Sequence, residues 1–587
     1  MGVRTISAEE ASQDVYRAPA PLRPLLASAA MLAMLLSLAL LLNGRPIGAG
    51  DTRANERVAA SLVEEGDFDL DEHPEVEPPF ARQVGEHRVS IYPPLTPLLA
   101  APVFALVRLG VALDETGSAL AGKLAAALLS GLAAGVLFLA VGLRRSQGAA
   151  AATAAVFALG TSVASTSQAL WQHPAAVLAL AAAILCLVRA DENDPRWAGR
   201  AALPLGLMVA ARHADLPLAA VIALALAIRF PRRIPHLALW GALPAAFVLA
   251  YNARTFGAPW HHGFSDSAQR FSAEWGVGHL GLLASPGKGL LVFTPVAAVA
   301  VAGLVVAFRR GERWLAGTLG AAALIHWMVM GRWGEWHGGD SWGPRLLTDA
   351  LPALFLFLPE GLELAGWAGR LLAALSIGVQ ALGMFAYDYR WERLHAHGEG
   401  AERPEVWDLA DSPIPFYARR GVFYFALPAV REGKAVVREH PVVWRGGAGS
   451  RIEFRAGEPA VAGQDRTLGH VFLQRGARVE EGRLRLKGRW AALFLRVDPA
   501  ARARRLELRV AGRGRGPLYV AERSVWGDPR FKTYLVSGAF VVRHPYHYPE
   551  SGGGDLLVTT GLGDGELQVD WVALVPPSDP LNPLRLP

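Results

Sequence analysis

Residues 25–42 read LLASAAMLAMLLSLALLL, an unbroken apolar run that ends at Asn43. A run of roughly 18 or more apolar residues is long enough to cross a bilayer as a helix. Similar runs of Leu, Ala and Val recur up to about residue 390, whereas the chain after about residue 420 alternates apolar and polar residues. The sequence therefore predicts a polytopic α-helical membrane protein with a separate C-terminal domain.

The composition of the 587 residues argues against several other classes of protein. The chain is 52% hydrophobic, with a mean hydropathy of +0.25 and a net charge of +6. The basic residues follow the membrane topology and form no patch, so we expect no nucleic-acid partner. The single cysteine, Cys186, lies in an apolar run; it excludes an intrachain disulfide and is expected to pack in the core.

About eleven apolar runs are candidate membrane spans. Arginine-rich loops alternate between them, and the positive-inside rule places those loops in the cytoplasm. The first run is long for a signal-peptide core and no small-residue cleavage site follows it, so we interpret it as a retained first span. The N-terminus is then cytoplasmic and the C-terminal domain extracytoplasmic (periplasmic) in an inner (plasma) membrane. The predicted spans are 25–42, 119–143, 148–165, 175–188, 201–211, 216–228, 234–251, 290–308, 314–330, 346–358 and 371–387.

The domain organisation follows from this division. Strict alternation at 505–510 and short β patterns at 555–558 and 567–572, separated by glycine-rich turns, favour an all-β sandwich or jelly roll. Pro413 and Pro415 make the connection before it poorly helical. The predicted segments are a cytoplasmic tail 1–24, a transmembrane catalytic domain 25–390 with a first outer loop 43–116, a linker 391–420 and a β-sandwich domain 421–587.

The stretch Gly50-Asp51-Thr52-Arg53-Ala54-Asn55-Glu56 follows the first span and has two interpretations. Residues 53–63 have helical character, so Asp51 or Thr52 could be the N-cap of a helix. Alternatively, Asp51 is a general base that deprotonates an acceptor hydroxyl just outside the membrane, or a carboxylate that positions it or a metal ion. Both roles are compatible.

Other polar motifs fall on the same predicted side of the membrane. Tyr92-Pro93-Pro94-Leu95 precedes an apolar stretch, 98–111, expected to lie along the membrane surface. Trp171-Gln172-His173 occupies the tip of a helical hairpin, where Trp171 is an anchor by default and His173 is a candidate substrate contact. Arg212, His213 and Asp215 separate two short apolar runs, and ionisable groups there mark a functional site or a buried pair. The acidic stretch 67–77 lacks fixed ligand spacing and is interpreted as a solvated loop.

Two loops carry candidate phosphate-binding and sugar-binding groups. Lys288, in Ser285-Pro286-Gly287-Lys288-Gly289-Leu290, is one of five lysines and offers an ammonium beside a helix start. The densest cluster is Arg332-Trp333-Gly334-Glu335-Trp336-His337-Gly338-Gly339-Asp340-Ser341-Trp342-Gly343-Pro344-Arg345. Trp faces suit sugar rings, glycine allows close backbone approach, and arginine suits phosphate. The candidate sugar-binding residues are Trp333, Trp336, His337, Asp340 and Tyr92.

These motifs together resemble the GT-C class of membrane glycosyltransferases, which use polyprenyl-phosphate sugars. The chain looks most like bacterial dolichyl-phosphate mannosyltransferase and aminoarabinose transferase relatives, and its added β domain is similar in layout to arabinosyltransferases that end in a carbohydrate-binding module. The resemblance implies that Asp51 is the catalytic base and that Lys288 and Arg345, with Arg212 and His173 as further candidates, hold the donor phosphate. It leaves open whether a divalent cation (Mg²⁺ or Mn²⁺) takes part, with Asp51, Glu56 and Asp69 as candidate ligands.

Three hypotheses follow. The first is an inverting hexosyl- or pentosyltransferase that takes a sugar from a polyprenyl-phosphate donor to a glycan, lipid or protein acceptor in the cell envelope, among membrane lipids. The alternative is a transporter or flippase of lipid-linked glycans without transferase chemistry, which predicts mid-span polar groups and repeated halves. The third concerns the C-terminal domain, which either binds glycan through Trp526, Tyr546, Tyr548 or Trp571 or is an inert lid.

Overall fold

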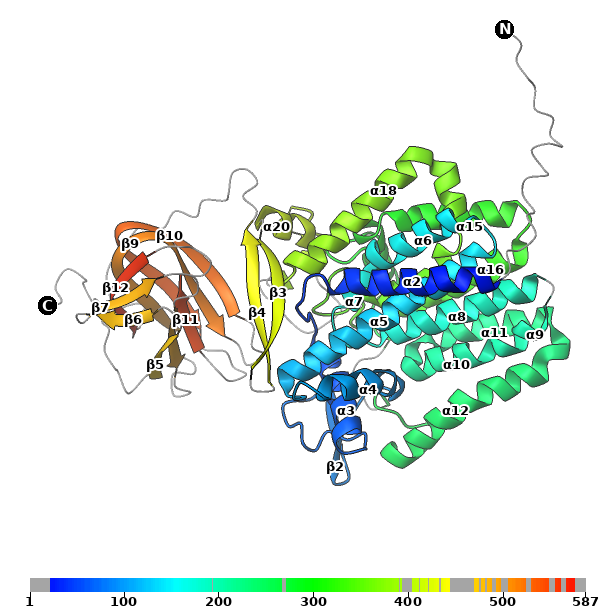
Figure 1. Ribbon diagram of the computed structural model, residues 1–587, viewed down its shortest axis with the longest axis horizontal. Helices are drawn as coiled ribbons and strands as arrows, with labels where there is room; N and C mark the ends of the chain where they lie inside the picture. The colour runs from blue at the N-terminus through cyan, green and yellow to red at the C-terminus, as the bar shows by residue number, and fades with distance from the viewer. Residues whose placement is uncertain are drawn as a thin grey trace, which may run out of the picture. The chain divides into compact units, whose positions relative to one another are not determined.

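A computed structural model gives the arrangement of the chain (Figure 1). It describes residues 22–192, 194–265, 271–389, 391–392, 404–410, 412–420, 422–431, 434–443, 469–474, 477–480, 483–487, 492–497, 505–523, 529–547, 555–560 and 566–575. The chain divides into two compact units, residues 1–445 and residues 446–587.

The first unit is mostly helical. Among the described residues, five helices are long and apolar enough to cross a membrane: α2 (Leu22–Leu41), α5 (Glu115–Gly142), α8 (His173–Asp191), α12 (Ile234–Phe256, with the turn before it) and α18 (Leu358–Ala386). Each contains or overlaps a predicted span. A helical membrane protein is thereby supported, while the count of about eleven spans stays a prediction.

Shorter helices pack between these five. Two predicted short spans form α10 (Ala202–Ala211) and α11 (Leu216–Arg229), joined by the 3₁₀ turn η1 (His213–Asp215). In Figure 1, α8, α10 and α11 lie side by side, and α11 also packs against α16 (Arg313–Met330). The remaining short helices and turns are α6 (Gln147–Leu159), α7 (Ser162–Thr166), α9 (Arg196–Arg200), η2 (Pro231–Arg233), α13 (Val277–Ala284), α14 (Leu290–Phe293), α15 (Val296–Arg309) and η4 (Pro404–Trp407).

Three predicted spans are wrong as single helices. Residues 148–165 divide into α6 and α7, and residues 290–308 divide into α14 and α15. The third is 346–358. The segment is a 3₁₀ turn, η3 (Arg345–Ala350), followed by the short helix α17 (Leu351–Phe355) and the start of α18. Pro352 and Pro359 lie in the first turns of α17 and α18, where their missing N–H groups are tolerated, and neither helix continues backward through them. A further break occurs inside α18, where Gly366 has φ +58°.

The linker also differs from its prediction. Residues 413–420 form the helix α20 (Pro413–Arg420), although two prolines had suggested a non-helical connection. Both prolines fall in the first turn, where no intrahelical partner for their N–H groups exists anyway. Proline position within a helix, rather than proline count, therefore decides the outcome here.

The predicted first outer loop, 43–116 (the first outer region), comprises α3 (Gly50–Glu64), the hairpin of β1 (Ala81–Val84) and β2 (His87–Ser90), and α4 (Leu95–Arg108). The N-cap of α3 is Ala49, and the Thr52 hydroxyl accepts a hydrogen bond from the Ala49 N–H at 3.0 Å. Asp51 is therefore not the cap, which corrects that interpretation. Leu98, Leu99 and Leu106 of α4 are exposed, as is its C-cap residue Leu109, which is expected of a helix at a bilayer surface.

The predicted C-terminal β region is confirmed. A hairpin of β3 (Val422–Arg431) and β4 (Lys434–Val443) lies in the first unit. The second unit holds an eight-stranded sheet of β5 (Gly469–Gln474), β6 (Ala477–Glu480), β7 (Arg483–Lys487), β8 (Ala492–Val497), β9 (Arg505–Arg523), β10 (Pro529–His547), β11 (Asp555–Thr559) and β12 (Glu566–Val575).

The long strand β9 organises this sheet. It pairs along its whole length with β10, and its other edge is shared between β11 and β12. Alternate residues of these strands, such as Leu508, Val510 and Val558, fill one core. Tyr546 is 1% exposed in that core and is not a glycan-stacking residue. Trp526 and Tyr548 lie outside the described residues; Trp571 lies in β12 and its side chain is not described.

Candidate functional site

An ion pair joins the first outer region to the loop before α17. Asp51 lies in the first turn of α3, and its carboxylate contacts the guanidinium of Arg345, the first residue of η3. The Arg345 Nε donates to the Gly338 carbonyl at 2.7 Å, and its guanidinium lies 4.3 Å from the ring centroid of Trp171. Three predicted motifs, around residues 51, 171 and 345, therefore meet at one place.

The backbone at Gly338 makes this contact possible. Gly338 has φ +74°, and a Cβ there would lie 3.1 Å from Cγ of Arg345. A left-handed conformation and a close approach both favour glycine. The glycine-rich composition of the 332–345 loop thus has a local steric reason at this position.

A small pocket lies beside the Asp51–Arg345 pair and has Arg345 in its wall; its free volume is about 10 Å³, room for one water molecule. Four of its twelve lining residues are aromatic, and several others carry hydroxyl, amide or carboxylate groups, a lining suited to an amphipathic ligand. Tyr389, in the wall, has φ +61°, which is rare for a residue other than glycine. The lining residues are Ile47, Ser165, Thr166, Gln168, Trp171, Asp340, Ser341, Trp342, Arg345, Gly383, Tyr387 and Tyr389.

Tyr92 lies close enough to the pair to interact electrostatically with both of its charges. It packs edge to face against Phe264 with ring centroids 5.6 Å apart. Burial and the negative charge of Asp51 raise the pKa of the Tyr92 phenol well above its usual value. The structure therefore places this predicted sugar-binding residue within electrostatic reach of Asp51, as a neutral hydroxyl.

Lys288 has a different environment from the one expected of a phosphate holder. It is buried, and its ammonium donates to the carbonyls of Gly339 (3.0 Å) and Ser341 (2.5 Å) and faces Glu392 at 3.5 Å. Burial raises the pKa of Glu392 to about 7, an effect that the Lys288 charge opposes. Lys288 thus holds the loop that carries Arg345 in place. In this arrangement the ammonium group of Lys288 donates its hydrogen bonds to protein oxygens.

The other candidates in the 332–345 loop separate into two groups. Trp336 is 0% exposed and packs against Gly278 and Gly281, so it has no free face for a sugar and that prediction is corrected. His337 is also buried, and its Nδ1 accepts from the Gly339 N–H at 3.1 Å. Trp333 is half-buried and contacts Phe264 and Phe271, while Asp340 is exposed at the pocket.

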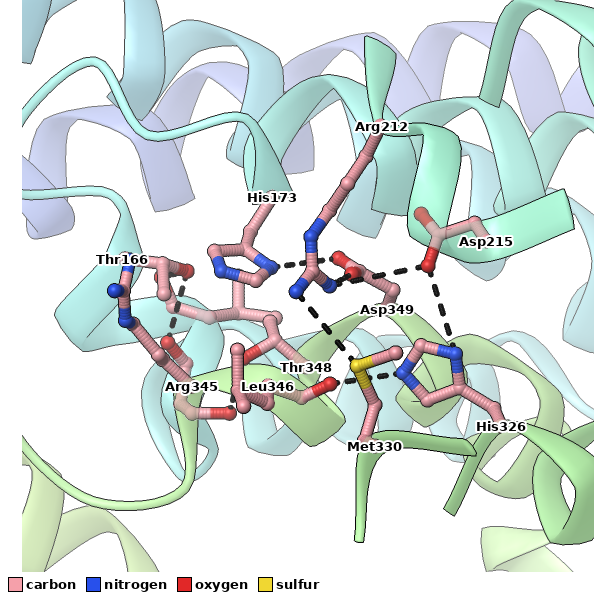
Figure 2. A network of polar contacts seen from close by, with 12 residues as sticks. Thr166, His173, Arg212, Asp215, His326, Met330, Arg345, Leu346, Thr348 and Asp349 are labelled. Atoms are coloured by element: carbon pink, nitrogen blue, oxygen red, sulfur yellow. Dashed lines mark hydrogen bonds and ion pairs between the residues drawn. The ribbon is translucent and has the colours of Figure 1, made fainter. Parts of the chain in front are cut away.

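A second polar cluster lies at the far end of η3 and is fully enclosed (Figure 2). Asp349 accepts from His173 Nδ1 at 2.9 Å and is ion-paired with Arg212. His173, at the start of α8, and Arg212, between α10 and η1, were predicted as donor-binding residues. Both instead bind Asp349, which lies at the opposite end of η3 from Arg345. Sequence reasoning missed Asp349; the available signal was the polar pair Thr348-Asp349 inside an otherwise apolar run.

The three candidate metal ligands do not form one site among the described residues. Asp69 belongs to an exposed group with Asp71 and His87, which includes neither Asp51 nor Glu56. His87 Nδ1 lies 2.7 Å from Asp71 and 3.4 Å from Asp69, so ion pairing within the hairpin accounts for this group. The Asp51 carboxylate is paired with Arg345. These residues do not fit a shared Mg²⁺ or Mn²⁺ ion, and we derive no step through one.

Glu56 lies on the inner face of α3. Its carboxyl is enclosed, and a Cβ at Gly122 of α5 would lie 2.7 Å from Glu56 Cγ. Burial raises the pKa of Glu56 to about 8. A carboxyl that is protonated at neutral pH is a poor cation ligand, which argues against Glu56 as the metal-binding partner of Asp51.

Glu56→Gln is expected to stabilise the protein at pH 8 but not at pH 4.5. The folded pKa of Glu56 is raised, so between these values the unfolded state has released the proton while the folded state keeps it, and stability falls as pH rises. The amide removes a penalty on the order of 3 kcal/mol at pH 8. The thermal midpoint of detergent-solubilised protein, measured across this range, should fall less in the variant. Glu64→Gln, on the exposed end of α3, is the control; an equal pH dependence in Glu56→Gln and wild type would contradict the assignment.

Comparison with known proteins gives little beyond this geometry. No family model matches the chain, and no curated protein matches it. Among solved structures, a match was found to the cryo-EM structure of arabinosyltransferase EmbB from Mycobacterium smegmatis, with a TM-score of 0.19 and 12% sequence identity. The alignment covers 99% of this chain and 66% of the EmbB chain. A likeness this weak supports no conclusion about activity.

Proposed function

We propose that this protein is an integral membrane glycosyltransferase that transfers a sugar, with inversion, from a polyprenyl-phosphate donor to a cell-envelope acceptor at the outer face of the membrane. The observation that carries the proposal is the Asp51–Arg345 pair. It brings a candidate base and a candidate phosphate ligand together beside an aromatic-walled pocket. The surface helix α4 belongs to the same outer region as Asp51.

Donor binding would activate the base in this arrangement. A phosphodiester anion competes with the Asp51 carboxylate for the Arg345 guanidinium, and arginine binds either anion in the same geometry. Once the donor phosphate occupies Arg345, Asp51 is released and can accept the proton of the acceptor hydroxyl. The acceptor oxygen forms the new bond to the anomeric carbon as the bond to the phosphate oxygen breaks, and Arg345 stabilises the charge on the departing phosphate.

The neighbouring residues would position the sugar. Trp171 is held by the Arg345 guanidinium, and Tyr387 and Tyr389 form part of the same wall. Aromatic faces bind the apolar faces of sugars, and the exposed Asp340 carboxylate can accept hydrogen bonds from hydroxyl groups. Lys288, by fixing the 338–341 loop, keeps Arg345 in place.

Transfer in proteoliposomes tests this function. The full-length protein is reconstituted and given polyprenyl-phosphate mannose or polyprenyl-phosphate arabinose, labelled in the sugar, with extracted envelope glycans as acceptors. We expect label to enter an acceptor through a new glycosidic bond, with release of polyprenyl phosphate. Movement of the intact labelled lipid between leaflets without bond formation would instead support the flippase alternative.

A further inference from the structure

The buried polar cluster at the Asp349 end of η3 contains three side chains that have no role in the proposed function. They are Asp215 at the end of η1, His326 on α16 and Asp349 on η3 (Figure 2). All three are at most 1% exposed, and one ligand atom from each lies within 4.8 Å of the others. Three elements distant in the sequence therefore converge on one enclosed point.

The hydrogen bond made by His326 Nε2 determines the protonation state of the other ring nitrogen, Nδ1. Nε2 lies 2.8 Å from the Leu346 carbonyl, and a carbonyl only accepts, so Nε2 carries the proton. In a neutral imidazole Nδ1 then has a lone pair, and this nitrogen faces Asp215 Oδ1 at 3.5 Å. A ring N–H bonded to a backbone carbonyl, with the second nitrogen free to coordinate, is the usual arrangement of a metal-binding histidine.

Asp215 lacks the partners that a buried carboxylate needs. It is 0% exposed, and neither of its oxygens has a hydrogen-bond partner; His326 Nδ1 has none either. The nearest guanidinium nitrogen, on Arg212, is 3.8 Å away and contacts Asp349 more closely. Burying an unpaired carboxylate is strongly unfavourable, so this carboxyl group is either protonated or balanced by a further cation.

The separation of Asp215 Oδ1 and His326 Nδ1 is too long for a direct hydrogen bond between them and fits two ligands of one metal ion. A hydrogen bond between Asp215 and His326 would bring the two atoms to about 2.6–2.9 Å. Two ligands of one tetrahedral ion, each at about 2.0–2.1 Å from it, are about 3.4 Å apart. The observed 3.5 Å matches the second case.

We propose that Asp215, His326 and Asp349 bind one divalent transition-metal ion of the zinc type. One imidazole and two carboxylates are ligands that zinc accepts. Arg212 already balances the charge of Asp349, so the ion would chiefly balance the charge of Asp215. The ion would join η1, α16 and η3. Since η3 begins at Arg345, the site would also fix the position of the residue that pairs with Asp51. This inference rests on geometry alone and does not depend on the proposed transferase activity.

Metal content tests the proposal. Full-length protein in detergent is stripped with a chelator, equilibrated with Zn²⁺, freed of excess metal and analysed by mass spectrometry. We expect one zinc per wild-type chain and none in Asp215→Asn or His326→Gln. The asparagine and glutamine side chains are close in size to the aspartate and histidine that they replace. In the His326→Gln variant, the side-chain amide can still donate to the Leu346 carbonyl. Co²⁺ in place of Zn²⁺ should give the visible absorption of a tetrahedral site.

Two controls make the result specific. His213→Gln removes a half-buried histidine from the same turn, outside the cluster, and should retain the zinc. The double variant Asp71→Asn/His87→Gln removes the exposed group of the β1–β2 hairpin and should also retain it. Wild-type protein that holds no zinc and has the same thermal midpoint with Zn²⁺ and with chelator would overturn the proposal in favour of a protonated Asp215. Zinc retained by both ligand variants would overturn it as well.

Discussion

Replacing Asp51 by Asn is expected to reduce sugar transfer by about 10²–10⁴-fold. The amide cannot accept the proton of the acceptor hydroxyl, yet it has nearly the size of the carboxylate and can still accept a hydrogen bond from Arg345. Asp51 is not the N-cap of α3, so the helix should form as in wild type. Initial rates of bond formation at saturating donor give the measurement.

Donor binding separates this explanation from simple damage to the site. Asp51→Asn removes a competing anion from Arg345, so the affinity for polyprenyl phosphate should be equal to or higher than that of wild type. Arg345→Met should have the opposite signature, with weakened donor binding. Asp71→Asn, an exposed carboxylate of the same outer region, is the matched control and should keep full activity. Wild-type turnover in Asp51→Asn would rule out the base assignment.

Replacing Asp349 by Ala is expected to destabilise the protein by about 3–5 kcal/mol. The substitution leaves the buried Arg212 guanidinium without its ion-pair partner and His173 without its acceptor. We expect a lower thermal midpoint and a smaller monodisperse fraction on size-exclusion chromatography. Asp340→Ala, an exposed position of the same loop region, should change the free energy of unfolding by no more than about 0.5 kcal/mol.

A compensating variant tests the cause of that loss. Arg212→Met together with Asp349→Leu replaces the pair with apolar side chains, and such exchanges of buried ion pairs are often neutral. The double variant should therefore recover most of the stability lost by Asp349→Ala. If it is no more stable than the single variant, the loss comes from packing or from the proposed metal ion rather than from an unpaired arginine.

The helices were largely predictable because their signal is local. Residues 25–42 and 175–188 gave α2 and α8 within a few residues, and the ionisable corner at Arg212 correctly separated α10 from α11. The prediction of one helix at 346–358 was wrong because a mean hydropathy over the segment does not register Pro352 and Pro359. The effect of each proline depends on its position relative to the start of a helix. The hydroxyl of Thr52, rather than the carboxylate of Asp51, makes the capping hydrogen bond of α3. Which of these two neighbouring residues does so depends on the exact residue at which the helix begins.

The candidate site was less predictable because its contacts are distant. The sequence marked Asp51, Trp171, Tyr92 and Arg345 as residues of interest, and the structure brings them together. It did not indicate that Lys288 would bind backbone carbonyls or that Trp336 would be enclosed, since either residue type occurs equally well at a ligand site. Asp349 carried little local signal, because a single carboxylate in an apolar run does not identify its partner.

The sequence by itself determined that this chain has apolar helices long enough to cross a membrane, a region rich in polar motifs after the first of them and a C-terminal β region. Backbone hydrogen bonding and hydrophobic burial act over short stretches, so these properties are readable from residue order. Only the tertiary structure decided which charges meet. Asp51 and Arg345 are 294 residues apart and His173 and Asp349 are 176 apart. Whether such groups form an ion pair, a binding site or a buried network depends on the packing of the helices between them.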